Sequence, residues 1–443
     1  MEGIKELMEF SSLFWAIPFL GIILSMSFMP LWCPNFWHKH NGYVPAFWSL
    51  IYLFFIGYIF GVSKIFDATF EPIFDHYIPF IILISALYIV SGGIFIDFPR
   101  ANGPMFNVSF LFFGSLLSGF IGTTGAATLL IRPLLRANAN RKYKTHILVF
   151  FIFLIANIGG ISTPLGDPPL FIGFLEGVDF FWFIKNLYRY QLATTLFLCI
   201  LFFLIDLFLL KKETQENIQA EDSHHLILRG KRNLILILGI LMAVILCNFE
   251  GNFVLFGEKF SYASLIRNSI LLLISIVSLL TTPPSIRERN SFSLEPIKEV
   301  VNLFASIFLT VTPIIAMLHQ GNDGSLKFIF DWIAPSGDII ASRCFWASGL
   351  LSSILDNAPT FLIFFHMLSG NANELMTVKA HLLTAISIST VFMGAITYIG
   401  NAPNLMVKSI AANYGVKAPS FIGYMIWSIG ILIPVFFVIS CIL

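Results

Sequence analysis

The stretches GISTPLGDPP (residues 160–169) and GAITYIGNAP (residues 394–403) interrupt two of the most apolar regions of the chain. Glycine weakens a helix, and proline removes a backbone hydrogen-bond donor, so neither stretch is favourable for helix. One gap-free frame matches the two stretches at these pairs: Gly160 with Gly394, Thr163 with Thr397, Gly166 with Gly400, and Asp167 with Asn401. The match predicts two broken helices that arose by duplication.

The composition indicates the surroundings of these breaks. The chain has 443 residues, of which 57% are hydrophobic and only 12% charged, whereas about a quarter of the residues of a soluble domain are charged. Apolar runs recur that are long enough to cross a hydrocarbon layer roughly 30 Å thick. We therefore predict an all-α polytopic membrane protein in a lipid bilayer. A net charge of +1 without a dense basic patch gives no sign of a nucleic-acid partner.

The apolar runs predict the same layout in two halves, residues 1–210 and 232–443. Each half is expected to hold three spans, a re-entrant hairpin, a broken helix and a final span. In the first half these lie near 10–29, 44–62, 76–97, 106–135 (hairpin), 146–175 (broken helix) and 190–210. The polar segment 211–231, which begins KKETQENIQAEDSHH, is predicted to be a solvated linker. The second half repeats the order near 232–248, 265–281, 299–319, 338–368 (hairpin), 381–411 (broken helix) and 420–442.

The two hairpin blocks are too long for one straight helix and carry small or polar residues near their middle. Thr128 precedes Thr163 by 35 residues and Thr360 precedes Thr397 by 37, which suggests that Thr128 corresponds to Thr360. A re-entrant hairpin makes no net crossing, so each half crosses five times, about 10 in all, and the second half is inverted. Most lysines and arginines then fall in inner loops if both termini lie outside and the linker is cytoplasmic. A bacterial inner membrane is the expected location.

Two acids, Asp167 and Asp356, are expected at membrane depth. A carboxylate there is costly, and its default explanation is a cation or proton site. We therefore predict both as sodium ligands, since hard cations prefer oxygen ligands. The neutral candidates in the same segments are Thr124, Thr128, Asn157, Thr163, Asn357, Thr360, Thr397 and Asn401. The alternative is a buried ion pair with Arg132, Arg343 or Lys408.

Asp206 stands four residues before the end of its predicted span. We expect its side chain to reach the membrane surface or to pair with Lys211. The five cysteines lie far apart, so neither disulfides nor a metal site is predicted, and no cofactor is expected beyond transported or coupling Na⁺ and H⁺.

The motifs around the breaks resemble those of a known group. They are Asn157–Gly160, Thr163–Phe171, LDNAPT at 355–360 and TYIGNAPN at 397–404. Over nearly the whole chain the sequence is similar to the NhaD-type sodium:proton antiporters and related citrate transporters of the ion transporter superfamily, which also holds arsenite permeases and divalent-anion symporters. The resemblance implies two hairpins, two broken helices, inverted halves and a homodimer.

The resemblance also implies one cation site between each hairpin tip and its own broken helix. In this chain the first would be formed by Thr124, Thr128, Thr163 and Asp167, and the second by Asp356, Asn357, Thr360, Thr397 and Asn401. The divalent-anion symporters carry Ser-Asn-Thr at both tips, whereas here the tips read Gly-Thr-Thr-Gly and Asp-Asn-Ala-Pro-Thr. The carboxylate-binding signature of that group is therefore absent.

Three transport functions follow from these expectations. Sodium:proton antiport leads, because sodium and protons can compete for the same carboxylates. The alternative is sodium- or proton-coupled transport of citrate or another small carboxylate, and arsenite extrusion is a third. An enzyme is not expected: an intramembrane aspartyl protease would need both acids on largely intact helices, which Pro168 and Pro169 oppose.

Overall fold

The computed structural model describes residues 12–98, 103–213, 227–249, 251–255, 258–319, 327–335 and 337–443. Within these residues the chain is helical apart from two short antiparallel strand pairs. Eight of the described helices are long and apolar enough to cross a membrane: Tyr43–Phe60, Ser63–Ser91, Pro104–Ile121, Thr145–Ser162, Phe180–Leu210, Tyr262–Thr281, Glu295–Met317 and Phe421–Ile442. The predicted all-α polytopic membrane fold is confirmed.

The first half follows the predicted order with two longer helices. Its elements are η1 (Leu13–Ala16), α2 (Ile17–Trp32), α3 (Pro34–His40), α4 (Tyr43–Phe60), α5 (Ser63–Glu71), η2 (Pro72–Tyr77), α6 (Ile78–Ser91), α7 (Pro104–Ile121), α8 (Thr123–Ala137), α9 (Thr145–Leu154), η3 (Ile158–Ser162), α10 (Pro168–Leu175) and α11 (Phe180–Leu210). The third span and α11 begin earlier than predicted. Charged residues such as Lys64 and Lys185 lower the hydropathy of their first turns without preventing helix.

The second half matches the predicted spans more closely. Its helices are α12 (Lys231–Leu246), α13 (Tyr262–Thr281), α14 (Pro284–Arg289), α15 (Glu295–Thr310), α16 (Thr312–His319), α17 (Lys327–Ile333), α18 (Ala341–Ile354), α19 (Asn357–Leu368), α20 (Ala372–Met376), α21 (Ala380–Met393), α22 (Ala402–Asn413) and α23 (Phe421–Ile442). Both predicted hairpin blocks are helix pairs. Gly122 alone joins α7 to α8, and two residues join α18 to α19.

Four strands were not predicted, because three or four residues are too few to show an alternating pattern. β1 (Phe95–Asp97) pairs with β2 (Ile227–Arg229), and β3 (Asn252–Leu255) pairs with β4 (Glu258–Ser261). β2 lies within the predicted linker 211–231, so the β1–β2 pair ties the C-terminal part of that linker to the first half. Residues 214–226 of that linker lie outside the described residues.

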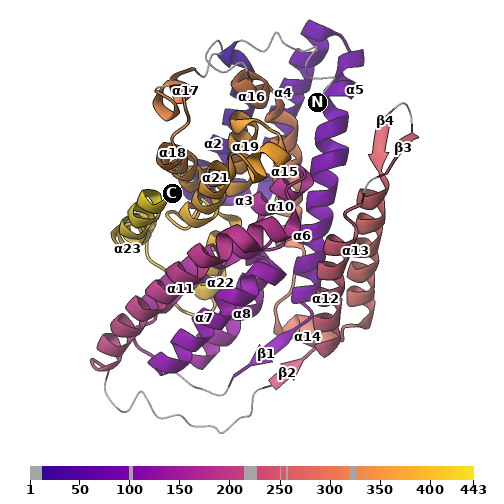
Figure 1. Ribbon diagram of the computed structural model, residues 1–443. Coiled ribbons are helices and arrows are strands. Elements are labelled where there is room, and N and C mark those ends of the chain that lie inside the picture. The colour runs from indigo at the N-terminus through magenta and orange to yellow at the C-terminus, as the bar shows by residue number, and fades with distance from the viewer. Residues whose placement is uncertain are drawn as a thin grey trace.

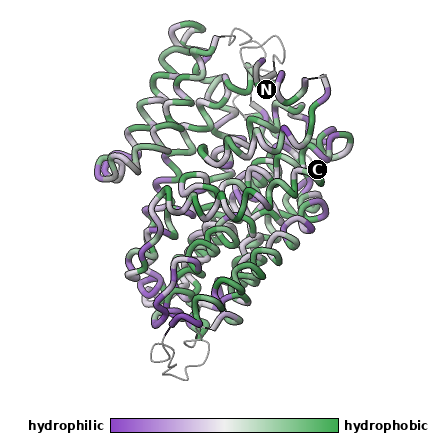
Figure 2. The backbone as a smooth tube through the Cα atoms, turned by 90° about the vertical axis from the view of Figure 1, so that its left-hand side faces the viewer, coloured by the Kyte–Doolittle hydropathy of each residue, from purple (hydrophilic) through white to green (hydrophobic). Residues whose placement is uncertain are grey.

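The two helix pairs lie toward opposite ends of the molecule. α7 and α8 lie toward the end that carries β1, β2 and α14, whereas α18 and α19 lie toward the other end (Figure 1). This arrangement supports inverted halves. Hydrophilic residues gather at the β1–β2 end, and the long helices are hydrophobic over most of their length (Figure 2).

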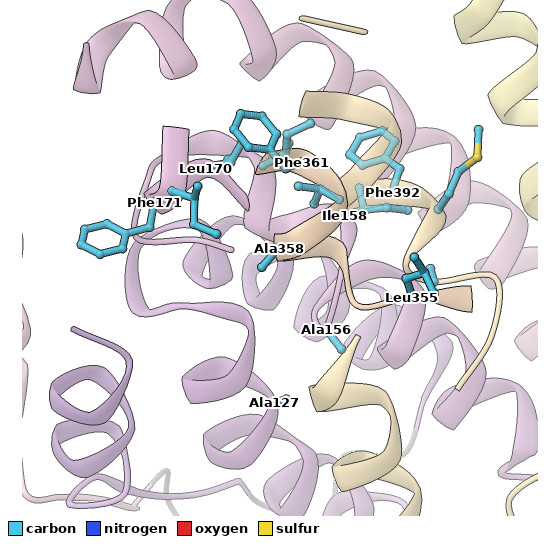
Figure 3. Packing of buried hydrophobic residues seen from close by; sticks show 14 of the residues in the cluster. Ala127, Ala156, Ile158, Leu170, Phe171, Leu355, Ala358, Phe361 and Phe392 are labelled. Atoms are coloured by element: carbon cyan, nitrogen blue, oxygen red, sulfur yellow. The ribbon is translucent and has the colours of Figure 1, made fainter. Parts of the chain in front are cut away.

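The first broken helix lies at the centre of the structure. Of the residues Thr145–Ser162, 94% are buried, against 28% in an 18-residue stretch of each of the helices Tyr262–Thr281 and Phe421–Ile442. α10, which continues the broken helix, packs along α19 of the other half, with Leu170 close to Phe361 (Figure 3). The breaks are therefore enclosed by protein, which is the condition for irregular backbone at membrane depth.

Candidate functional site

Each break separates two helical segments that restart at prolines. α9 ends at Leu154 and α10 begins at Pro168, while α21 ends at Met393 and α22 begins at Ala402 with a proline next to it. Proline fits the first turn of a helix because the backbone N–H there has no partner within the helix. The prolines thus fix where each second segment starts.

The matched glycines are required by close packing. A Cβ atom on Gly166 would lie 2.0 Å from the carbonyl oxygen of Gly160, and one on Gly400 would lie 2.7 Å from that of Gly394. None of these four glycines has a positive φ. Steric exclusion, rather than an unusual backbone conformation, therefore explains why both breaks carry the same glycine pair.

Thr163 and Thr397 connect the breaks to the hairpins through hydrogen bonds. Their hydroxyls donate to the carbonyl oxygens of Gly119 and Ser353 at 2.5 and 2.6 Å, and both contacts join residues 44 positions apart. Each hydroxyl also accepts from the backbone N–H two residues later, at 3.1 Å. The structure therefore places these two predicted ligands in backbone contacts.

These equivalent contacts also set the register of the repeat. Residue numbers in the second half exceed those of their counterparts by 234 in the breaks (Thr163 and Thr397) and in the hairpins (Gly119 and Ser353). Under this register Thr360 corresponds to Ala126, so the predicted match of Thr128 with Thr360 is wrong by two residues. The prediction relied on similar separations, 35 and 37 residues, from the threonines of the breaks. Thr128 and Thr360 both lie close to a hairpin tip, but they are not at equivalent positions.

Asp167 is the point at which both halves meet. Its side chain is 2% exposed, and Oδ1 accepts from the Thr123 hydroxyl at 2.6 Å and from Asn401 Nδ2 at 3.3 Å. Oδ2 accepts from the side-chain amide of Asn357. Two of its partners thus come from the second half. The Asp167 cluster therefore brings together residues of the two cation sites that the resemblance implies, one from each half.

A further amide layer supports this cluster. Asn157 Oδ1 accepts from Asn401 Nδ2 at 3.2 Å, and Asn157 Nδ2 donates to Asn404 Oδ1 at 2.8 Å. Asn404 then donates to the carbonyl oxygens of Gly394 and Thr397. Sequence reasoning missed Thr123 and Asn404 as site residues. Their signals were weak: Thr123 adjoins Thr124, and Asn404 is the last residue of TYIGNAPN.

The basic residues considered as ion-pair partners are engaged elsewhere. Arg132 donates to the Thr128 carbonyl oxygen at 2.9 Å, Arg343 donates to that of Trp332, and the Lys408 ammonium lies 4.4 Å from the ring centre of Tyr398. Among the described residues, no salt bridge joins Asp167 or Asp356 to a lysine or arginine. This argues against a purely structural ion pair at either acid.

The tip of the second hairpin carries two buried oxygens without hydrogen-bond partners. They are Oδ1 of Asp356, which is 5% exposed, and Oδ1 of Asn357, which is fully buried. Leaving such acceptors unpaired costs about 1–3 kcal/mol each. A cation is the kind of partner that each of these oxygens lacks. The remaining predicted ligand of this tip, Thr360, donates within its helix to the Asp356 carbonyl oxygen.

Two cavities adjoin the cluster. A small one of about 30 Å³ is lined by Asp167, Thr123, Thr124 and the first break, and it has room for a water molecule or a monovalent cation. A large one of about 440 Å³ is lined by Thr124, Thr128, Arg132 and Asp356 together with α15 and α22. Thr124 lines both cavities, so an ion in the first and a molecule in the second would be neighbours.

Asp206 does not reach the membrane surface as predicted. Its side chain is fully buried and accepts from Arg141 at 2.6 Å and from Asn107 at 2.9 Å, with His146 at 3.0 Å. Arg141 also pairs with Glu213 at 3.1 Å. The network ties the bases of α7 and α8 to α9 and α11, so Lys211 is not its partner. The prediction failed because Arg141 is 65 residues away in the sequence.

An all-α membrane fold in which a broken helix and a hairpin tip each hold a buried acid beside an internal cavity is that of a membrane transport protein. The comparison with known families agrees. The chain belongs to the family described as "Putative citrate transport" (CitMHS_2), whose model matches residues 8–443. A search of curated proteins finds no match. The family supports the citrate-transporter part of the resemblance and leaves the narrower NhaD-type antiporter a prediction.

Proposed function

We propose that the chain is a secondary active transporter that couples sodium or proton movement to transport of a small carboxylate of the citrate class. The observation that carries the proposal is the contact between Asn357 and Asp167 across the two halves, at a hairpin tip where Oδ1 of Asp356 and Oδ1 of Asn357 are buried without a hydrogen-bond partner. These groups are the hard oxygen ligands that a dehydrated monovalent cation requires. No catalytic chemistry is proposed.

The coupling step follows from competition at Asp167. With no cation bound, the amides of Asn357 and Asn401 donate N–H groups to the carboxylate. Each amide carries an oxygen beside its nitrogen, so rotation of the amide group would present that oxygen to a bound cation instead. A proton on Asp167 would displace the cation. Either ion changes the net charge next to the large cavity and thereby its affinity for an anion.

The size of the large cavity favours a carboxylate substrate over cation exchange alone. Its volume of about 440 Å³ lies within the roughly 300–1,000 Å³ of small-molecule sites. A monovalent cation needs far less space. The family description points the same way. Asp356 faces this cavity, so an anion would bind best after a cation or proton has neutralised that acid.

Sodium:proton antiport is the second candidate. It is favoured by the absence of a basic partner for either acid within the described residues, because such acids are free to alternate between proton and cation. For carboxylate transport and for sodium:proton antiport alike, the end of the molecule near β1 and β2 would be the cytoplasmic side. The distribution of lysine and arginine predicts this orientation.

Liposomes with purified protein distinguish the two functions. We expect labelled citrate to accumulate when an inward sodium or proton gradient is imposed and to stop when the gradient is collapsed. A pH-sensitive dye inside the same liposomes reports exchange when sodium, lithium or potassium is added without citrate. A dye signal with no uptake of any carboxylate would instead establish cation:proton antiport.

A further inference from the structure

The helix pair α10 and α19 is tied at both ends. At their N-terminal ends, the Asn357 amide donates to Asp167. Nine residues later in each helix, Glu176 Oε1 lies 3.3 Å from His366 Nε2, and His76 of η2 approaches the same oxygen at 3.5 Å. In this helix pair, the basic residue His366 of α19 therefore has an acidic partner, Glu176.

The repeat supplies a second version of this helix pair. With the difference of 234, α8 corresponds to α19 and α22 to α10, and Asn401 and Thr123 both contact the same Asp167 oxygen. Arg132 stands at the position of His366, and Ile410 stands at the position of Glu176. The α8–α22 pair thus has a basic residue, Arg132, at the position of His366, but an apolar residue, Ile410, at the position of the acid.

Arg132 and Ile410 both line the large cavity. The only hydrogen bond of Arg132 among the described residues goes from Nη1 to the Thr128 carbonyl oxygen. Two glutamates on the cavity wall are engaged elsewhere: Glu295 pairs with Lys298 at 3.0 Å, and Glu299 accepts from Trp37 Nε1 at 2.9 Å. A partly buried guanidinium therefore faces the cavity without a carboxylate from the described protein.

We infer that a carboxylate group of the transported substrate binds Arg132, in the place that corresponds to Glu176 beside His366 in the α10–α19 pair. Guanidinium and carboxylate match in charge and planar geometry, which makes this pairing strong and directional. Thr124 lines the same cavity and carries a hydroxyl group, whereas the Thr128 hydroxyl already donates to the carbonyl oxygens of Thr124 and Gly125. Asp356 lines this cavity too, and a bound cation or proton would neutralise it. The inference rests on the proposed function and assigns its substrate-binding residue.

Restoring the missing acid tests the inference. In Ile410→Glu the new carboxylate would pair with Arg132 and compete with the substrate. We expect this variant, and Arg132→Gln, to weaken citrate binding to the detergent-purified protein by about tenfold or more. Ile410→Gln has nearly the same size and no charge, so it should weaken binding less than Ile410→Glu. Arg132→Lys should retain part of the affinity because the charge remains.

Sodium-dependent thermal stabilisation, measured on the same samples, reports whether each variant is folded with an intact cation site, and we expect it to persist. Citrate binding by Ile410→Glu and Arg132→Gln at the wild-type affinity would overturn the assignment of Arg132 while leaving carboxylate transport standing. Failure of the wild-type protein to bind or transport any carboxylate would overturn the proposed substrate class, and the role of Arg132 with it.

Discussion

Asp167 and Asn401 occupy matched positions in the two halves, 234 residues apart, and the Asn401 amide donates to the Asp167 carboxylate at 3.3 Å. Each is the residue before the second helical segment of its break, and their backbone angles are nearly the same, with φ of −146° and −153°. The duplication has therefore brought two equivalent positions into one site, in which only one of them carries a charge.

The charge should be exchangeable between these two positions. Asp167→Asn removes the carboxylate from the site, and we expect cation-coupled uptake to fall to about the level of empty liposomes because the coupling ion loses its charged ligand. The double variant Asp167→Asn with Asn401→Asp returns one carboxylate to the same cluster, and it should recover part of the uptake. If the uptake by Asp167→Asn equalled that of the wild-type protein, Asp167 would not be a ligand of the coupling ion.

The glycine pairs of the breaks give a stability prediction. Gly166→Ala places a methyl group 2.0 Å from the Gly160 carbonyl oxygen, so it should destabilise the protein by at least the roughly 1–3 kcal/mol typical of overpacking. Gly430→Ala is the control, since a Cβ atom there meets open space. Thermal unfolding in detergent should show a large loss for the first variant and none for the second. If Gly166→Ala and Gly430→Ala had equal unfolding midpoints, close packing would not be the reason for a glycine at position 166.

The sequence predicts breaks and hairpins at these places because glycine, proline and polar residues within a long apolar run disfavour a straight membrane-spanning helix. It does not predict that Asp167 binds Asn357 and Asn401, since a repeat aligns the halves without stating how they pack together. Nor does it separate Thr123 from Thr124: that choice depends on Gly122, whose φ of 80° places the turn of the first hairpin.

The buried Asp206–Arg141 pair should stabilise the base of the first hairpin. Both side chains are fully buried, and removing one partner of such a pair costs about 3–5 kcal/mol. Asp206→Ala should therefore lower the unfolding midpoint strongly. The matched control is Glu295→Gln, which breaks an ion pair whose side chains are 65% and 66% exposed and should cost about 0–1 kcal/mol. Similar decreases of the unfolding midpoint in both variants would show that the buried ion pair contributes no more to stability than the exposed one.

The contact between Glu176 and His366 predicts a pH dependence of stability. Burial alone would raise the pKa of Glu176, but the hydrogen bond from His366 and the charges of His76 and His366 hold that pKa below its ordinary value of 4.5. The ionised carboxylate therefore stabilises the folded protein above about pH 4.5, and this contribution is lost as the pH falls through the folded pKa.

Glu176→Gln should accordingly be less stable than wild type at pH 7, and the difference should shrink as the pH is lowered below about 4.5. Unfolding midpoints of the two proteins, measured in parallel from pH 7 to pH 3, report the difference. A difference that stays constant over this range would show that the charge of Glu176 does not contribute.

An ion at the Asp167 cluster and a carboxylate in the adjoining cavity should bind cooperatively. Coupling between two sites is reciprocal, so each ligand must strengthen binding of the other by the same factor. The most direct measurement is the citrate dissociation constant of the purified wild-type protein at increasing sodium concentration and at several pH values, paired with the sodium dissociation constant with and without citrate. We predict that the citrate constant falls as sodium or proton concentration rises, and that citrate lowers the constant of the coupling ion equally. A citrate affinity that is independent of both ions would contradict coupling between the two sites.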